Sequence, residues 1–268
     1  MHEPIEPKLE YVDKFEKKII EQNIEFSSEE LIKDGAFKYD MVQNNADYAA
    51  MLQSIDESLQ RIVEALKAKG ILDNTIIVVT SDNGGKNHNP FKVDCNQPTC
   101  NLPLRRGKSL LHEGGIRVPL IISWNKQIPK GSVSNYPTMG TDHYASLLEL
   151  SGLESIPEQH LDSYSYVDAL YGKNGKREYL FWNFPQNSKS IRIGYESERA
   201  LRRGDYKLIK VMSKPERFMM YNLKEDLGES ENIAEKEPEK TKELIKLMDK
   251  VSIDIGALDS YVGSKKPN

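Results

Sequence analysis

The chain has 268 residues, enough for a large hydrophobic core and one or two domains. Its 38% hydrophobic and 29% charged residues predict a soluble globular protein. The net charge of −4, from 37 basic and 41 acidic residues, argues against nucleic acid as a partner. No apolar run approaches the roughly 20 residues of a membrane-spanning helix, so no membrane span is predicted.

Two amphipathic helices are predicted in the N-terminal part. Residues 7–22 have apolar side chains on one helical face, and residues 42–69 form a longer helix that Gly70 ends. The long helix carries an apolar stripe at helical spacing, which predicts that this face packs into a core. The stripe consists of Tyr48, Met51, Leu52, Ile55, Leu59, Ile62, Val63 and Leu66.

The middle of the chain alternates between strands and helices. Residues 75–80 and 117–124 are predicted buried strands, and residues 141–152 are a predicted helix capped by Thr141 or Asp142. Helix, strand, strand and helix in this order are typical of an α/β sheet that is covered on both faces.

After about residue 170 the pattern changes to short strands without crossover helices. The segments 178–184, 200–212 and 218–223 predict a small antiparallel sheet, and residues 236–251 predict a closing helix. The change in pattern divides the chain into a predicted α/β part, residues 1–172, and a predicted antiparallel part, residues 173–268.

The segment TIIVVTSDNGG, residues 75–85, ends a strand with a carboxylate, an amide and two glycines. Ligands of open α/β sheets bind at the carboxyl ends of the strands, where Asp82 and Asn83 lie. Their oxygens suit Ca²⁺ or Mg²⁺, and the glycines let the backbone turn away from a ligand. By itself, Asp-Asn-Gly after a strand is more typical of a simple turn.

A basic, glycine-containing loop, residues 101–119, precedes the second strand. Bases next to glycines suit an anionic group, because charge and backbone N–H groups meet there; a solvated connecting loop is the alternative. Together the two segments indicate a metal and an anion that share one site. The charged and titratable residues of the loop are Arg105, Arg106, Lys108, His112, Glu113 and Arg117.

The segment ILDNTIIVVTSDNGG followed by LPLRRGKSLLHEGGIRVPLI resembles the sulfatase family of the alkaline-phosphatase-like superfamily, in both order and separation. The first residues, MHEPIEP, are similar to the family's His-x-Pro segment, and the resemblance extends over nearly the whole chain. It implies an α/β fold: the C-terminal portion of an alkaline-phosphatase-like three-layer sandwich, followed by a small antiparallel sheet with a C-terminal helix.

The resemblance also implies roles for individual residues. Asp82 and Asn83 match the two late ligands of the family's divalent cation, usually Ca²⁺. Lys108 matches the lysine that holds the sulfate ester, and His2 matches a histidine that contacts the sulfate or the leaving oxygen. Sulfate esters are accordingly the expected substrates.

Other residues of the basic loop match the family motif without an implied chemical role. Glu113, Gly114, Gly115 and Arg117 are expected to shape the loop. His112 is expected to lie exposed on the loop and to take no part in catalysis.

The family's nucleophile motif, Cys/Ser-x-Pro/Ala-Ser-x-Arg with the cysteine oxidised to formylglycine, is absent from the sequence. Cys95 and Cys100 lack the serine and arginine of that motif, and they are either thiols or a local disulfide. The chain therefore resembles the C-terminal half of a sulfatase. It is expected to be inactive alone and to bind Ca²⁺ weakly, while the parent enzyme is expected to be periplasmic or secreted.

Three functions remain open at this point. The first is a fragment of a sulfuric ester hydrolase, and the second is a phosphatase or phosphotransferase on the same fold. The third is a non-catalytic binding or structural module that retains the fold. Because strand 75–80 would have an apolar unpaired edge, a homo-oligomer that covers this edge is also expected.

Overall fold

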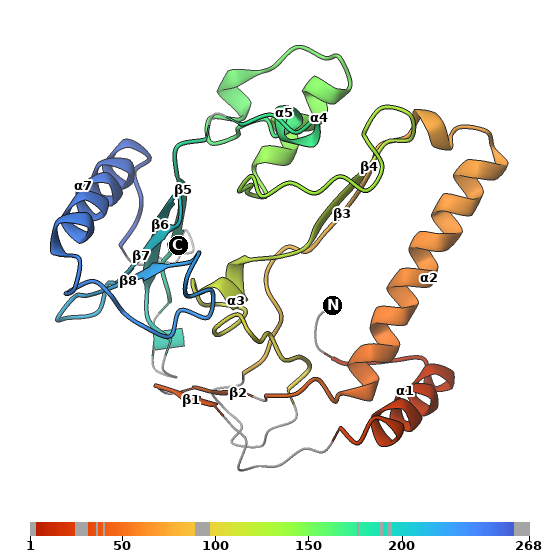
Figure 1. Ribbon diagram of the computed structural model, residues 1–268, viewed down its shortest axis with the longest axis horizontal. Coiled ribbons are helices and arrows are strands. Elements are labelled where there is room, and N and C mark those ends of the chain that lie inside the picture. The colour runs from red at the N-terminus through yellow and green to blue at the C-terminus, as the bar shows by residue number, and fades with distance from the viewer. Residues whose placement is uncertain are drawn as a thin grey trace, which may run out of the picture.

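The structure of the chain is a computed structural model that describes residues 4–24, 32–35, 37–39, 41–88, 97–175, 177–187, 190–191 and 195–259. His2 and Cys95 lie outside these residues. The C-terminal sheet with its helix and the long helix α2 lie on opposite sides of the molecule, with the strand pair β3–β4 between them (Figure 1). Among the described residues, no helix combines the length and apolar character needed to cross a membrane.

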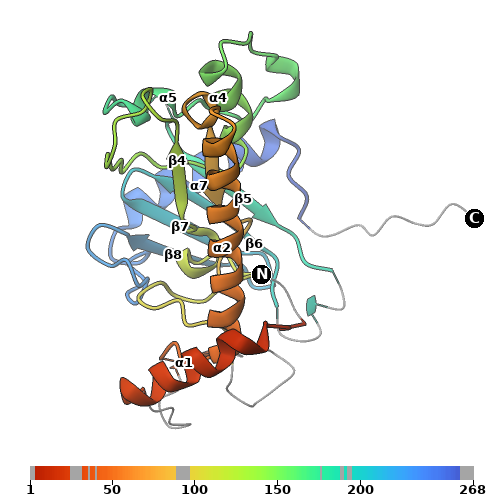
Figure 2. The ribbon, with the colours of Figure 1, turned by 90° about the vertical axis from the view of Figure 1, so that its right-hand side faces the viewer.

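The N-terminal part contains α1 (Leu9–Glu21), the short strands β1 (Ile32–Asp34) and β2 (Phe37–Tyr39), which pair antiparallel, and α2 (Ala46–Ala68). The predicted helix at 42–69 starts later, because the Asn45 side chain accepts a hydrogen bond from the backbone N–H of Tyr48 and caps the helix. Helix α1 packs across the lower end of α2 (Figures 1 and 2), where the Tyr11 hydroxyl donates to Glu57 at 2.6 Å.

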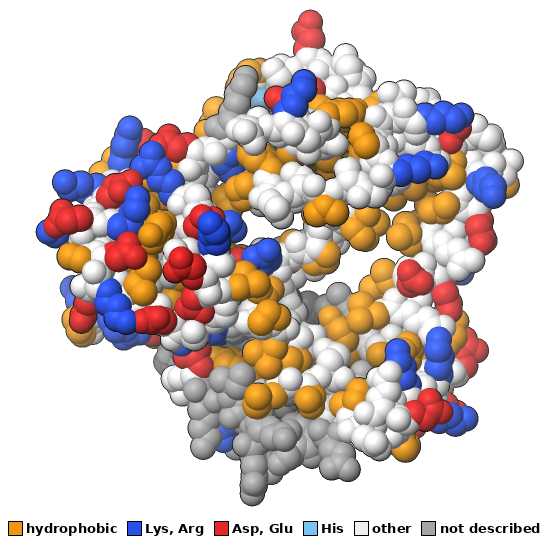
Figure 3. Space-filling model, in the orientation of Figure 1, with side chains coloured by type: hydrophobic (Ala, Val, Ile, Leu, Met, Phe, Trp, Pro, Cys, Tyr) orange, Lys and Arg blue, Asp and Glu red, His pale blue; other side chains and the backbone are white. Residues whose placement is uncertain are grey.

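The predicted burial of the α2 stripe is wrong. Only Ala50 of this helix is buried, while Leu52, Ile55 and Ile62 are 47%, 50% and 55% exposed. Figure 3 shows apolar side chains around a hollow in this view, and Leu52 and Ile55 line the smaller of two clefts, so the described residues cover this face only in part. The periodicity correctly predicts a helix but not what covers it.

Strands β3 (Ile77–Thr80) and β4 (Leu120–Ser123) form a two-stranded antiparallel pair, preceded by the 3-10 turn η1 (Leu72–Asn74). Strand β4 starts after Pro119, which has no N–H for the ladder and whose carbonyl accepts from the Thr80 hydroxyl at 3.0 Å. The prediction that both strands are buried in a sheet covered on both faces is wrong for the described residues, because Ile121 is 61% exposed.

The antiparallel pairing decides where the two motifs meet. Val78 pairs with Ile122 and Thr80 with Leu120, so the end of β3 lies beside the start of β4. The Asp-Asn segment after β3 and the basic loop before β4 are therefore at the same edge of the pair, which parallel strands would not bring about.

Between β3 and the C-terminal sheet the chain forms four short helical segments: α3 (Glu113–Ile116), α4 (Asp142–Leu150), the 3-10 turn η2 (Pro157–Gln159) and α5 (Val167–Leu170). The start of α4 is fixed by Asp142, whose buried carboxylate accepts from the backbone N–H groups of Met139 and Tyr164 and pairs with Arg177. Thr141 precedes the helix without a side-chain cap.

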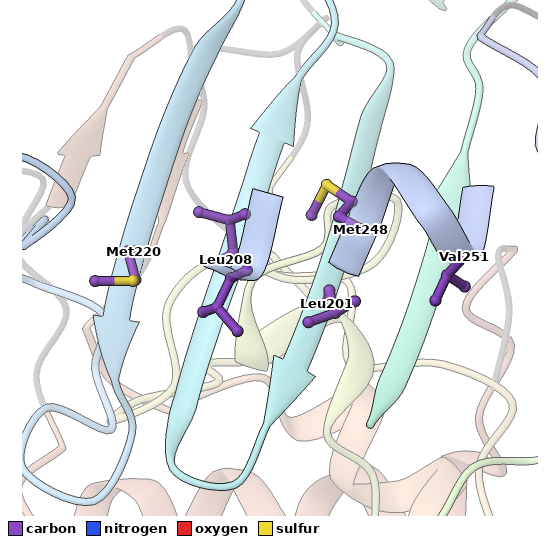
Figure 4. Packing of buried hydrophobic residues seen from close by; sticks show 6 residues of the cluster. Leu201, Leu208, Met220, Met248 and Val251 are labelled. Carbon is purple, nitrogen blue, oxygen red and sulfur yellow. The ribbon is translucent and has the colours of Figure 1, made fainter. Parts of the chain in front are cut away.

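The C-terminal part is the predicted antiparallel sheet, a meander of β5 (Leu180–Phe184), β6 (Glu198–Arg203), β7 (Tyr206–Val211) and β8 (Arg217–Asn222). Helix α7 (Pro238–Asp254) covers one face, as Figure 4 shows, and each buried aliphatic side chain there contributes roughly 1.5–3 kcal/mol. The largest buried cluster is Leu201, Leu208, Met220, Leu244, Met248 and Val251. The domain boundary at residue 172 stays a prediction.

Candidate active site

Two backbone hydrogen bonds join the two motifs. The Gly84 N–H donates to the Gly115 carbonyl at 2.9 Å, and the Lys108 N–H donates to the Gly85 carbonyl at 3.1 Å. The segment after β3 and the basic loop are thus held side by side at main-chain distance.

Glycine is required where these segments cross. A Cβ atom on Gly84 would lie 1.8 Å from the Gly114 carbonyl oxygen, and one on Gly114 would lie 2.1 Å from the Arg106 carbonyl oxygen. Neither position can accept a larger residue without displacing backbone. This close approach supports the expectation that the glycines shape the loop.

Asp82, Asn83 and Lys108 line the same two clefts, and we refer to these three residues as the site strip. One cleft, of about 1580 Å³, extends toward the C-terminal sheet, and the other, of about 570 Å³, extends toward α2. Asp82 is exposed, whereas Asn83 and Lys108 are half-buried. The site strip therefore lies where both clefts meet, open to a ligand from either side.

The backbone around Lys108 is strained. Arg106 and Ser109 have φ angles of 60° and 74°, and non-glycine residues pay about 1–3 kcal/mol for such conformations. Contacts hold the backbone at Arg106: the Asn101 side-chain amide donates to the Gly85 carbonyl at 2.8 Å and to the Arg106 carbonyl at 3.0 Å. Sequence reasoning missed Asn101, since an amide in a loop carries no signal of a long-range backbone contact.

Asp82 and Asn83 fit a divalent cation as part of a larger ligand set. They provide a carboxylate and an amide oxygen, and one Asp82 oxygen already accepts the Asn83 N–H at 3.1 Å. Ca²⁺ takes six to eight oxygens, so further ligands are needed. Among the described residues, no group of three or more His, Cys, Asp or Glu side chains is arranged to hold a metal.

Two of the bases that the sequence groups with Lys108 already have a carboxylate partner. The guanidinium groups of Arg105 and Arg106 both bind Asp34, with nitrogen–oxygen distances from 2.7 to 3.2 Å. Burial opposes ionisation of Asp34, but the two arginines outweigh it and hold the pKa of Asp34 well below its ordinary value. Lys108 lines both clefts beside Asp82, and so does Arg117, which lies 3.6 Å from Glu113.

The expectation that His112 is exposed is wrong. Its side chain is fully buried just before α3, with the Tyr221 ring 6.1 Å away, and its ring nitrogens have no hydrogen-bond partner in the part of the chain that the structure describes. Burial, followed by the charges of Arg106, Lys207 and Arg105, lowers its pKa well below 6.5. His112 is therefore a neutral packing residue.

Comparison with known proteins identifies the family. The family model "Sulfatase" matches residues 1–153, and the model "N-sulphoglucosamine sulphohydrolase, C-terminal" matches residues 106–254. The two matches overlap over the basic loop, α3, β4 and α4, so together they extend over most of the chain.

Individual proteins agree with the family models. A sulfatase from Formosa agariphila is 35% identical over 72% of this chain and 36% of its own length. The N-acetylglucosamine-6-O-sulfatase of Bacteroides thetaiotaomicron is 28% identical over 90% of this chain and 41% of its own. The crystal structure of Ps i-CgsB superimposes with a TM-score of 0.73 at 26% identity over 96% of this chain and 49% of that one.

The chain thus spans about 36–49% of the length of these proteins. The mixed α/β architecture, with the small antiparallel sheet and its closing helix, is the predicted alkaline-phosphatase-like fold. The crossing of the Asp-Asn-Gly-Gly segment and the basic glycine loop, the two family models and the shared fold lead to one conclusion: the chain belongs to the sulfatase family.

Proposed function

We propose that the site strip is the part of a sulfate-ester-hydrolysing site that this chain supplies. Lys108 binds the sulfate group, and Asp82 and Asn83 donate oxygens to a divalent cation, Ca²⁺. The observation that carries the proposal is the pair of backbone hydrogen bonds, Gly84 to Gly115 and Lys108 to Gly85, because they place the three side chains on the rim of the same clefts.

The chemistry of these side chains suits a sulfate ester. A lysine ammonium forms charge-assisted hydrogen bonds with sulfate oxygens. A cation bound by Asp82 and Asn83 would polarise the sulfate oxygens as a Lewis acid. His2, which lies outside the described residues, is proposed as a second contact to the ester.

Covalent transfer of the sulfate group requires a nucleophile, which we propose to be formylglycine in the complete enzyme. Neither Cys95 nor Cys100 has the residues around it that such a cysteine needs. We therefore expect this chain to bind sulfate and Ca²⁺ weakly and to show no turnover by itself.

The names of the similar proteins suggest a substrate class. One relative is an N-acetylglucosamine-6-O-sulfatase, and one family model describes an N-sulphoglucosamine sulphohydrolase. We infer that the complete enzyme acts on a sulfated sugar rather than on a simple aryl sulfate. The cleft of about 1580 Å³ beside the site strip supports this inference, since it has room for a saccharide.

Sulfate titration of the whole chain tests the proposal. Sulfate replaces chloride at constant ionic strength, and binding is measured by calorimetry for the wild type, Lys108→Ala and Lys250→Ala, an exposed lysine on α7. We expect millimolar binding that Lys108→Ala weakens at least tenfold and Lys250→Ala leaves unchanged. Equal affinities for all three proteins would overturn the role of Lys108.

Calorimetry with other ligands tests the remaining assignments. Asp82→Asn should weaken Ca²⁺ binding at least fivefold, and an unchanged Ca²⁺ affinity would remove Asp82 from the ligand set. A clear preference for phosphate over sulfate would favour the phosphatase alternative instead of the sulfatase.

A further inference from the structure

Two buried carboxylates reach the basic loop from the C-terminal part of the chain. Glu198 on β6 accepts the backbone N–H of Leu111 at 2.8 Å, and Glu229, after β8, accepts the backbone N–H of Glu113 at 2.6 Å. Both glutamates are essentially inaccessible to solvent, at 1% and 0% exposure. Hydrogen bonds from backbone N–H groups to a buried carboxylate are short and strong, so each fixes the position of the loop.

Lys207 on β7 compensates the charge of this arrangement. Its ammonium group lies 2.9 Å from a Glu113 oxygen and 2.8 Å from a Glu229 oxygen, and the side chain is fully buried. Arg106 lies 3.5 Å from Glu198. Each buried carboxylate therefore has a cation beside it, without which the cost of burying the charge would be several kcal/mol.

These contacts lie behind the loop and not in the clefts. Leu111 and Glu113 line the larger cleft together with Lys108, whereas Glu198, Glu229 and Lys207 line neither cleft. Within the loop, Leu110 donates to the Gly107 carbonyl at 3.2 Å. Because Leu111 and Glu113 follow Lys108 closely in the same loop, we expect a displacement at either residue to move Lys108 as well.

We propose that Glu198, Glu229 and Lys207 are positioning residues that hold the Lys108 loop in its strained conformation from behind. The three residues form what we call the rear clamp. The clamp fixes the loop whatever the loop binds, and only its effect on sulfate binding rests on the proposed function.

Variants of Glu229 separate positioning from simple stabilisation. Glu229→Leu removes the acceptor for the Glu113 N–H, whereas Glu229→Gln keeps an oxygen there and leaves Lys207 paired with Glu113. Leu244→Ala is the matched control, because it removes a buried side chain of α7 from the core of the C-terminal sheet without touching the loop.

Two measurements are made on each protein at a temperature where it is fully folded. The first is the dissociation constant for sulfate, and the second is amide hydrogen exchange in residues 107–115. We expect Glu229→Leu to weaken sulfate binding at least tenfold and to accelerate exchange in this segment at least tenfold. Glu229→Gln should recover both to within about threefold of the wild type, and Leu244→Ala should lower the melting temperature but change neither.

Several results would overturn the rear clamp. It fails if folded Glu229→Leu exchanges in residues 107–115 like the wild type, or if Leu244→Ala changes exchange and sulfate affinity as much as Glu229→Leu does. If the wild type binds no sulfate although its loop is protected from exchange, the proposed function fails. The accelerated exchange in Glu229→Leu would then still confirm the clamp.

Discussion

Gly114 lies at the point where the basic loop crosses the backbone of its own first half. A Cβ atom there would approach the carbonyl oxygens of Arg106 and Arg105 to 2.1 and 2.5 Å. We expect Gly114→Ala to lower the free energy of unfolding by about 2 kcal/mol or more, as overpacking against backbone does. Gly140→Ala is the matched control, since no atom of the described residues outside its chain neighbours lies within 4 Å of its added Cβ. Urea denaturation monitored by circular dichroism measures the stability of both variants. Equal stabilities would contradict the close approach of Gly114 to the backbone.

The burial of His112 predicts that the stability of the folded chain depends on pH. Because its pKa is lowered in the folded chain, mainly by burial, the unfolded chain binds a proton below about pH 6.5 that the folded chain does not. Stability is therefore fully present above pH 6.5 and falls as the pH decreases, by at most about 1.4 kcal/mol per pH unit.

The comparison of His112→Phe with the wild type isolates this effect. Between pH 7.5 and 5.5 the wild type should lose about 1 kcal/mol more of its free energy of unfolding than His112→Phe does. His160→Gln, at the half-buried residue that follows η2, serves as the control for the loss of a histidine elsewhere in the chain. Parallel curves for the wild type and His112→Phe would show that His112 titrates normally.

At the scale of elements, the apolar stripe of α2 stays partly exposed to solvent in the described fold. Large exposed apolar surfaces mark sites of association, and Leu52, Ile55 and Ile62 are each about half exposed. We expect the triple change of these residues to serine to cost little stability, about 0.5 kcal/mol per site, and to reduce self-association.

Sedimentation velocity over a range of protein concentrations measures the association. Gln60→Ser, an exposed polar position of the same helix, is the control for a change that leaves the stripe intact. A loss of several kcal/mol in the triple variant would mean that the stripe is buried in solution. An unchanged degree of association would instead mean that the α2 stripe takes no part in it.

The elements themselves were well predicted by local pattern. The helices at 9–21, 46–68, 142–150 and 238–254 and the meander from β5 to β8 were all expected, with ends displaced by a few residues. The displaced ends follow local chemistry: Asn45 caps α2, and Pro119 delays β4. The short elements β1, β2, α3 and α5 were not predicted. The predicted burial was also wrong, because periodicity marks an apolar face without showing what packs on it.

For the whole molecule, buried charges connect regions far apart in the sequence. Asp34 of β1 binds Arg105 and Arg106, and Arg105 also donates to the Glu229 carbonyl at 2.7 Å. Lys207 of β7 joins Glu113 to the same region. The basic loop is thus fixed between the N-terminal strand pair and the C-terminal sheet, and the site strip depends on both.

The sequence by itself determined the family, the order of the elements and the candidate residues Asp82, Asn83 and Lys108. Periodicity predicted the order of the elements, whereas the resemblance of the motifs to sulfatases implied the family and the roles of these residues; the match to two family models confirmed the family. The residue roles stay predictions until the titrations are made.

Only the tertiary structure decided which residue pairs with each buried charge and which apolar side chains are covered. It paired Arg105 and Arg106 with Asp34, buried His112, and placed Glu198, Glu229 and Lys207 behind the loop. These outcomes depend on contacts between residues that are up to 124 positions apart, as for Arg105 and the Glu229 carbonyl. The cost of burying a charge or an N–H group is set by the partner that folding brings to it, and no local pattern specifies that partner.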